Sequence, residues 1–524
     1  MKRRKMKMAN KSVFASVVGR LLPRPDAVNS EGAPAYKLTP KQKLAQLAAT
    51  GCVNRTFYAE AREQVAEVLP LIEELDPTYV AQVAVYAREK GYMKDMPALL
   101  AAALTVKDPA LAAKVFNRVI DNGRMLRNFV QIMRSGAVGR KSLGSGPKRM
   151  VQKWLNEATD TMLIRAAVGK DPSLADVIKM VHPKPASKAR EALFAYLIGK
   201  DHDAALLPIE IKEFEAFKED QNNKVPNVPF QMLTALDLKT GHWRQIADDA
   251  GWHMTRMNLN TFARHGVLKG FRTVRKIATR LRDEEAIANA KVFPYQLMVA
   301  YLMAADTVPR VIKNALQDAM ELATKNVPAL SGNVAVCPDI SGSMNWPITG
   351  YRPGASSVVR CVDVAALITA TVIRKNPDAT VLPFHNYVER AKFNSRDSVM
   401  TNASKLACLP RGGTNCSAPL KELNQKKAAV DLVILVSDNE SWVDATRRSD
   451  TGLMREWSVL KGRNPNAKLV CIDLVPNGTT QAVTRGDILN IGGFSDAVFG
   501  VIASFAGGDV GVDHWVGEIE RVTV

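Results

Sequence analysis

The 524-residue sequence has only six cysteines, and no two of them have the CxxC spacing of a zinc or redox motif. Such cysteine usage indicates buried thiols in a reducing compartment, and we expect a cytoplasmic protein. No apolar run approaches the roughly 20 residues of a membrane-spanning helix, so no membrane partner is expected. A secretory signal is not predicted either, because the short apolar stretch 13–22 is interrupted by Arg20.

Motifs of common catalytic centres are also missing. The sequence has no GxxxxGKS/T phosphate-binding loop, no HExxH metalloprotease motif and no GxSxG nucleophile motif. We therefore expect a protein that is not an enzyme.

Negative charge is scarce in the first part of the chain. Of the 71 basic and 52 acidic residues, 20 and 19 follow residue 330, so residues 1–330 hold 51 and 33. Eight basic residues and no acidic one lie in the first 24. This excess fits a polyanion partner such as nucleic acid, although basic surfaces without one are common. We expect residues 1–35 to form a basic, disordered tail.

Residues 36–328 carry a repeated helix-start signal, a capping residue followed by proline. The signal occurs at Thr39-Pro40, Asp76-Pro77, Asp108-Pro109 and Asp171-Pro172, with a loose period in the thirties. Strand signals are scarce in this range. Paired amphipathic helices with such a period predict an all-α, HEAT-like helical-repeat domain.

Residues 329–524 follow a different pattern. Asn326-Val327-Pro328 breaks the last helix, and short apolar runs then alternate with helical stretches. This alternation predicts a doubly wound, Rossmann-like α/β domain. The predicted strands are residues 333–336, 379–384, 430–436, 469–474 and 497–502.

Oxygen-bearing side chains follow two of these predicted strands. Asp339, Ser341 and Ser343 come after the first, Thr414 lies on a Gly-rich turn, and Asp438 ends the strand at 430–436. The carboxyl ends of parallel strands converge on one crevice, so we expect these side chains to meet. Two carboxylates and three hydroxyls without His or Cys suit Mg²⁺ or another divalent cation that keeps some of its waters. A DxSxS segment alone would equally fit a capped turn.

The ordered pattern D-x-S-x-S, T, D resembles the metal-ion-dependent adhesion site of von Willebrand factor A domains. A basic helical-repeat module followed by such a domain resembles the Ro autoantigen family, whose shared region is the TROVE module. The likeness is carried by residues 43–47 with Tyr58, Arg140 with 151–157, 181–185, 257–259 with 267–268, 412–417 and 437–441.

The resemblance implies a ring in which the A domain closes the gap between the first and last helical repeats. It implies binding of small noncoding Y RNAs on a basic outer surface and of single-stranded 3′ ends of misfolded RNA in the central hole. A role in noncoding-RNA quality control or degradation follows, with polynucleotide phosphorylase as an exoribonuclease partner tethered by RNA. We also expect a monomer.

The RNA-binding residues expected from charge and resemblance include His182, which matches a Y RNA contact position of the family. A histidine beside a proline is otherwise a common turn residue, and the basic run near Arg140 otherwise fits a solvated loop. The basic face from Lys269 to Arg280 would either line the hole or keep the helices soluble. The full set is Arg140, Lys141, Lys148, Arg149, Lys170, His182, Lys184, Lys269 and Arg272.

Two departures from the family pattern concern RNA geometry. The segment 139–146 is longer and richer in glycine than usual, and Asn260 stands where the family has glycine. An alternative function is a Mg²⁺-dependent adaptor whose A domain captures an acidic residue of a partner protein. A chelatase-like ATPase subunit fits less well, because the chain has no acidic run.

Overall fold

The computed structural model describes residues 23–50, 61–290, 292, 294–349, 359–445, 451–475, 477–494, 496–508 and 514–524. The chain divides into two compact units. Described residues 23–50 and 327–518 form one of them, which we call the sheet unit. Residues 62–326 and 519–524 form the other, the helical unit.

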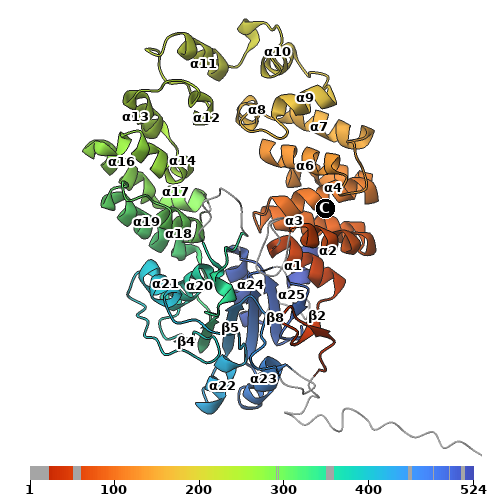
Figure 1. Ribbon diagram of the computed structural model, residues 1–524, viewed down its shortest axis with the longest axis vertical. Helices are drawn as coiled ribbons and strands as arrows, with labels where there is room; N and C mark the ends of the chain where they lie inside the picture. Colours follow the sequence, from red (N-terminus) through yellow and green to blue (C-terminus); the bar gives the residue numbers. More distant parts are fainter. Residues whose placement is uncertain are drawn as a thin grey trace, which may run out of the picture. The chain divides into compact units, whose positions relative to one another are not determined.

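The helical unit is a succession of α-helices joined by short connections, which follow one another in a curved array (Figure 1). This confirms the predicted helical class. No helix in the described part of the chain is long and apolar enough to cross a membrane. The helices are α2 (Ala61–Glu74), α3 (Pro77–Glu89), α4 (Asp95–Lys107), α5 (Pro109–Val119), α6 (Gly123–Ser135), α7 (Ser145–Glu157), α8 (Asp160–Ala166), α9 (Leu174–Val181), α10 (Lys188–Leu197), α11 (Ile209–Glu219), α12 (Phe230–Leu233), α13 (Thr240–Asp249), α14 (Trp252–Met257), α15 (Leu259–Arg264), α16 (Phe271–Leu281), α17 (Glu284–Asn289), α18 (Pro294–Leu302) and α19 (Arg310–Ala323), with 3₁₀ turns η1 (Ala204–Leu206), η2 (Val267–Lys269) and η3 (Thr324–Asn326).

Side-chain caps explain where several of these helices begin. Asp76 and Asp108 accept hydrogen bonds from first-turn N–H groups of α3 and α5, so both predicted starts are confirmed. The start predicted at Asp171-Pro172 is wrong, because α9 begins at Leu174. There Ser173 and Asp176 form a reciprocal capping box, which satisfies the N–H groups of both residues.

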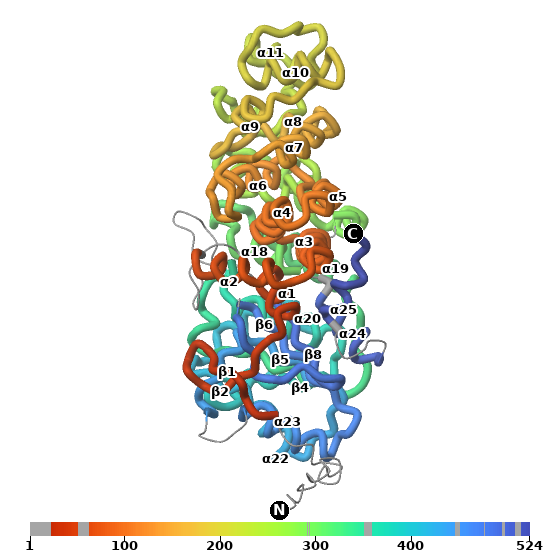
Figure 2. The backbone as a smooth tube through the Cα atoms, turned by 90° about the vertical axis from the view of Figure 1, so that its right-hand side faces the viewer, coloured from red at the N-terminus to blue at the C-terminus, as the bar shows by residue number. Residues whose placement is uncertain are grey.

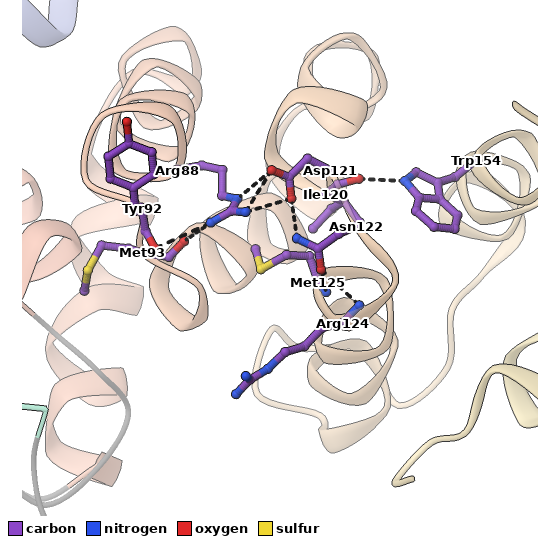
Figure 3. A network of polar contacts seen from close by, with 9 residues as sticks. All are labelled: Arg88, Tyr92, Met93, Ile120, Asp121, Asn122, Arg124, Met125 and Trp154. Atoms are coloured by element: carbon purple, nitrogen blue, oxygen red, sulfur yellow. Dashed lines mark hydrogen bonds and ion pairs between the residues drawn. The ribbon is translucent and has the colours of Figure 1, made fainter. Parts of the chain in front are cut away.

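The turn at 120–122 ties three helices of the array together (Figure 3). Arg88 of α3 pairs with Asp121 at 2.8 Å, and Asn122 caps α6 by accepting from its first-turn N–H groups. The indole N–H of Trp154 in α7 donates to the Ile120 carbonyl at 2.7 Å. Neighbouring helices are thus fixed by polar contacts as well as by apolar packing.

The carboxyl-terminal residues 519–524 pack on α3 and α5 of the same unit. Gln82 Nε2 donates to the carbonyl of Val522 at 3.1 Å, and Lys114 Nζ donates to a terminal oxygen of Val524 at 2.8 Å. These bonds make the end of the chain part of the helical unit.

The sheet unit is built on a five-stranded parallel sheet with the order β4-β3-β5-β6-β8. Its buried core confirms the α/β class expected for the second part of the chain. The strands are β3 (Val334–Pro338), β4 (Thr380–Val381), β5 (Leu432–Ser437), β6 (Lys468–Asp473) and β8 (Ile488–Gly492). The helices are α20 (Cys361–Lys375), α21 (Val399–Ala407), α22 (Ala418–Gln425), α23 (Gly452–Arg463), α24 (Asp496–Gly507) and α25 (His514–Glu520), with the 3₁₀ turn η4 (Ser343–Asn345).

One predicted strand of this domain is wrong. Residues 497–502 lie in α24, and the fifth strand is β8, which the pattern did not identify. The apolar character of α24 continues to Ala506, and a run of that length fits a buried helix better than a strand.

The described residues before Thr50 belong to the sheet unit, which differs from the expected boundaries of a tail over 1–35 and a helical domain from 36. Strand β1 (Ala27–Val28) pairs with β2 (Pro34–Lys37), which pairs with β7 (Thr479–Thr480), and α1 (Pro40–Thr50) packs on β8 (Figure 2). Gly492 permits this packing, because a Cβ there would lie 2.2 Å from Gln46 Oε1. The basic residues 1–22 of the expected tail lie outside the described residues.

The cysteines of the described residues are free thiols. Cys337, Cys361, Cys416 and Cys471 are buried in the sheet unit, as expected, whereas Cys408 is exposed. Cys52 lies outside the described residues.

Candidate metal centre and basic surface

Two neighbouring strands bring Asp339 and Asp438 together. Strands β3 and β5 are parallel, with Pro338 opposite Val436, and each strand is followed directly by one of these aspartates. The Asp339 N–H donates to the Val436 carbonyl at 2.8 Å. Both side chains are buried, with exposed fractions of 0% and 2%.

The loop after Asp339 folds back on its carboxylate. The Ser341 N–H donates to Asp339 Oδ1 at 2.7 Å, and the hydroxyls of Ser341 and Ser343 lie 3.2 Å apart. The Gly342 N–H donates to the Gly412 carbonyl at 2.9 Å, which joins this loop to the Gly-rich turn.

Thr414 is held in the same region by the segment that follows Asp438. Its carbonyl accepts hydrogen bonds from the N–H groups of Trp442 and Val443, each at 3.1 Å, and its side chain is buried. The turn approaches Trp442 so closely that a Cβ on Gly413 would lie 2.5 Å from the indole ring. The structure therefore brings all five predicted metal ligands to one edge of the sheet.

The electrostatics of this cluster disfavour two ionised carboxylates without a cation. Burial, together with the charge of Asp438, raises the pKa of Asp339. Burial also raises the pKa of Asp438, whose Oδ2 atom is buried without a hydrogen-bond partner in the described part of the chain. A bound cation would neutralise this pair and give the open oxygen a partner.

The donor types fit a hard cation. Within the described ranges no group of three or more His, Cys, Asp or Glu side chains is placed to hold a metal. The oxygens available at this edge come from two carboxylates and three hydroxyls, a set that suits Mg²⁺ more than Zn²⁺.

Three polar residues beside this cluster were not predicted. Ser437 donates to Asp339 Oδ2 at 2.6 Å, and it immediately precedes Asp438. Burial raises the pKa of Glu440 to about 8, and burial places the pKa of Asp473 well above the ordinary range of a carboxyl group. Asp473 ends β6 as Asp438 follows β5, so an acidic residue at the end of an apolar run is the signal that would have found it.

The nine residues predicted to bind RNA lie in the helical unit, spread over several elements. Arg140 and Lys141 precede α7, which carries Lys148 and Arg149. The other five predicted residues are Lys170, His182, Lys184, Lys269 and Arg272. None of the nine side chains forms a hydrogen bond or ion pair in the part of the chain that the structure describes.

The backbone of His182 takes part in the structure of its turn, whereas its imidazole ring forms no hydrogen bond, ion pair or ring contact with a described residue. It ends α9 in the left-handed conformation, with φ 48°, and its N–H donates to the Ile178 carbonyl at 2.9 Å. Gln152 of α7 donates to the Val181 carbonyl at 2.6 Å, which fixes the turn. The His182 side chain is exposed. The backbone thus forms the turn, while the imidazole remains available to a ligand.

The basic face from Lys269 to Arg280 divides into free and structural residues. Arg280 is structural, because it donates to the carbonyls of Ala247 and Asp248 at 2.8 and 2.7 Å. Lys276 forms an ion pair with Asp248 at 3.3 Å. Lys269, Arg272 and Arg275 have no such partner among the described residues, so the free positive charge lies just before α16 and in its amino-terminal half.

The curved helical array, together with a parallel-sheet domain that carries two carboxylates and three hydroxyls at its strand ends, defines a helical-repeat protein with a von Willebrand factor A domain. Comparison with known proteins shows what the chain is similar to. Residues 333–506 match the family model described as the Ro60 vWA domain. The RNA-binding protein RO60 of Deinococcus radiodurans is 26% identical over 519 residues, which cover 92% of this chain and 95% of that protein.

A solved structure agrees with this likeness at the level of the fold. The crystal structure of the Deinococcus radiodurans RO (RSR) protein matches with a TM-score of 0.64 and 22% identity, covering 90% of this chain and 100% of that chain. The resemblance to the Ro family that the motifs predicted is thereby confirmed.

Proposed function

We propose that this protein is a non-enzymatic, Ro-like RNA-binding protein whose helical unit supplies the RNA-binding surface. The observation that carries the proposal is the free state of the nine basic side chains, none of which has an intramolecular partner in the described residues. Each is available to a phosphate, and neutralised phosphates release counterions. The similarity to the Deinococcus radiodurans protein described as the RNA-binding protein RO60 supports the same function.

The proposal extends to the kinds of RNA. Small noncoding, Y-like RNAs bind the outer basic surface through the His182 turn, and single-stranded 3′ ends of misfolded RNAs enter a central hole. The protein then acts in the cytoplasm as a monomer in RNA quality control, with an exoribonuclease such as polynucleotide phosphorylase as partner. Single-strand channels of this kind combine positive charge with exposed aromatic side chains.

The metal centre supplies a second part of the proposal. Asp339, Ser341 and Ser343 hold one Mg²⁺ directly or nearly so, and Thr414 and Asp438 complete the site directly or through water. Mg²⁺ bound there would supply a Lewis-acidic position for an acidic group of a partner.

An adaptor function of the sheet unit is a second candidate, and the surface around the metal loops favours it. Tyr387, Trp442 and Val443 are large apolar residues with exposed fractions of 60%, 46% and 36%. Trp442 and Val443 lie against Gly413, one residue from Thr414. Exposed apolar side chains beside a metal site suit a protein partner that contributes a carboxylate.

A salt titration tests the leading function. The affinity of the full-length protein for a small structured RNA should fall on the order of 10³-fold between about 50 and 200 mM salt if six or more phosphates are contacted. RNA binding that does not change with salt would contradict an interface made of these cations.

A further inference from the structure

Phe271 is the most exposed large hydrophobic residue of the described chain. It opens helix α16, and 77% of its side chain is accessible to solvent. The opposite face of the helix fixes this orientation, because Val274, Ile277 and Leu281 are buried. The ring makes no aromatic or cation–π contact with any described residue. Phe271 therefore does not serve the packing of its own unit.

The surroundings of Phe271 are positive. Arg272 follows it, Arg275 lies one helical turn further on the same side, and Lys269 precedes it by two residues. All three cations are exposed and have no ion-pair partner among the described residues. The first turn of α16 has no acidic residue, and Gly270 provides no side-chain cap, so the helix dipole adds to the positive field.

We infer that Phe271 is a stacking platform for an unpaired base of single-stranded RNA, with Lys269, Arg272 and Arg275 binding the neighbouring phosphates. This inference rests on the proposed RNA-binding function and names a contact for it. A base stacks on an exposed aromatic ring whatever its identity, and cations beside the ring follow the backbone. A duplex offers the same phosphates but hides the faces of its bases.

The charge around the ring favours RNA over a protein partner. A protein interface needs an apolar patch, whereas Phe271 is a single ring among three unpaired cations. The arrangement pairs one flat apolar surface with several phosphate-binding groups, as single-strand sites do.

The test measures full-length Phe271→Ala against an RNA hairpin with a single-stranded 3′ tail and against the same hairpin with a blunt end. Affinity for the tailed RNA should fall about 5- to 150-fold, the range for loss of one base stack. The slope of log affinity against log salt should stay unchanged, because no phosphate contact is lost. Affinity for the blunt hairpin should also stay unchanged.

Three further variants make the test specific. Phe271→Trp should retain tight binding of the tailed RNA, and Phe271→Leu should not, because leucine is apolar but has no flat π face. Ile209→Ala is the matched control: Ile209 also opens a helix and is 62% exposed, but Glu210 follows it, so binding should be unchanged. Circular dichroism should show all variants folded.

Several outcomes would overturn the inference. It would be wrong if Phe271→Ala bound the tailed RNA as tightly as the wild-type protein does. It would also be wrong if this variant lost affinity equally for the tailed and the blunt hairpin, or if Phe271→Leu bound the tailed RNA as tightly as wild type. In each of these cases the wild-type protein would still bind RNA in a salt-dependent way. Absence of such binding by the wild-type protein would instead refute the proposed function on which the inference rests.

Discussion

Asn156 holds Lys184 by a hydrogen bond from its side-chain amide to the Lys184 carbonyl, at 2.9 Å. The oxygen of the same Asn156 side-chain amide accepts a hydrogen bond from the Ala186 N–H at 3.1 Å. Helix α7 therefore fixes the conformation of the turn that presents His182. Two segments that carry the family likeness are thus in contact, although 28 residues separate Asn156 from Lys184.

Asn156→Ala should weaken RNA binding indirectly. Loss of the two hydrogen bonds should lower the free energy of unfolding by about 1–2 kcal/mol and let the turn move. His182→Ala should instead reduce RNA affinity with little change in stability, because its exposed ring has no partner among the described residues. Thermal unfolding and RNA titration of the two variants would distinguish the positioning role of Asn156 from the RNA contact made by His182. A marked loss of stability in His182→Ala would contradict the conclusion that the His182 ring makes no stabilising contact.

Single basic substitutions should change the salt dependence in a countable way. Arg149→Ala and Lys184→Ala should each reduce the slope of log affinity against log salt by about 0.7–0.9, the effect of one phosphate contact. Lys325→Ala is the control, because Lys325 is already paired with Glu284 at 2.9 Å. The same slope change in the control would mean that net charge, and not a local contact, determines the affinity.

The sequence pattern predicted the sheet best where a strand is short, apolar and followed by a polar residue. Strand β5 has six buried residues and leads directly to Asp438, so both its extent and the place of the carboxylate were visible. In α24 the composition is equally apolar, and without alternation a buried helix and a buried strand look alike.

Contacts between distant parts of the chain were not predictable from local pattern. The Ser30 N–H donates to Glu440 at 2.7 Å across 410 residues, and β2 pairs with β7 across more than 400. Nothing in the polar segment around Ser30 distinguishes it from a solvated tail. Its place is decided by strand β7 and by Glu440, which both lie in the other half of the sequence.

Asp438→Asn should stabilise the metal-free protein. Burial raises the pKa values of Asp339 and Asp438, so above about pH 4 the folded state binds more protons than the unfolded state, and the free energy of unfolding falls as the pH rises. Removing one carboxylate should recover on the order of 1 kcal/mol near pH 8, the free energy that corresponds to about one pKa unit. Thermal unfolding between pH 5 and pH 8 in the presence of EDTA would measure this gain. If the stability of wild type and variant depended on pH to the same extent, the buried pair of aspartates would not be the source of that dependence.

Asp339→Ala should remove Mg²⁺ binding and leave RNA affinity nearly unchanged, because the proposed ligands and the proposed RNA contacts lie in different units. The variant loses the acceptor of two short hydrogen bonds, from Ser341 and Ser437, so Asp339→Asn is the milder companion that keeps an acceptor oxygen. Both variants should stay folded, because the surrounding strands β3 and β5 are buried and apolar. Isothermal titration with Mg²⁺ and RNA binding in EDTA would provide the two measurements. A folded Asp339→Asn protein that no longer binds RNA would show that the metal centre takes part in RNA recognition and would refute this division of roles.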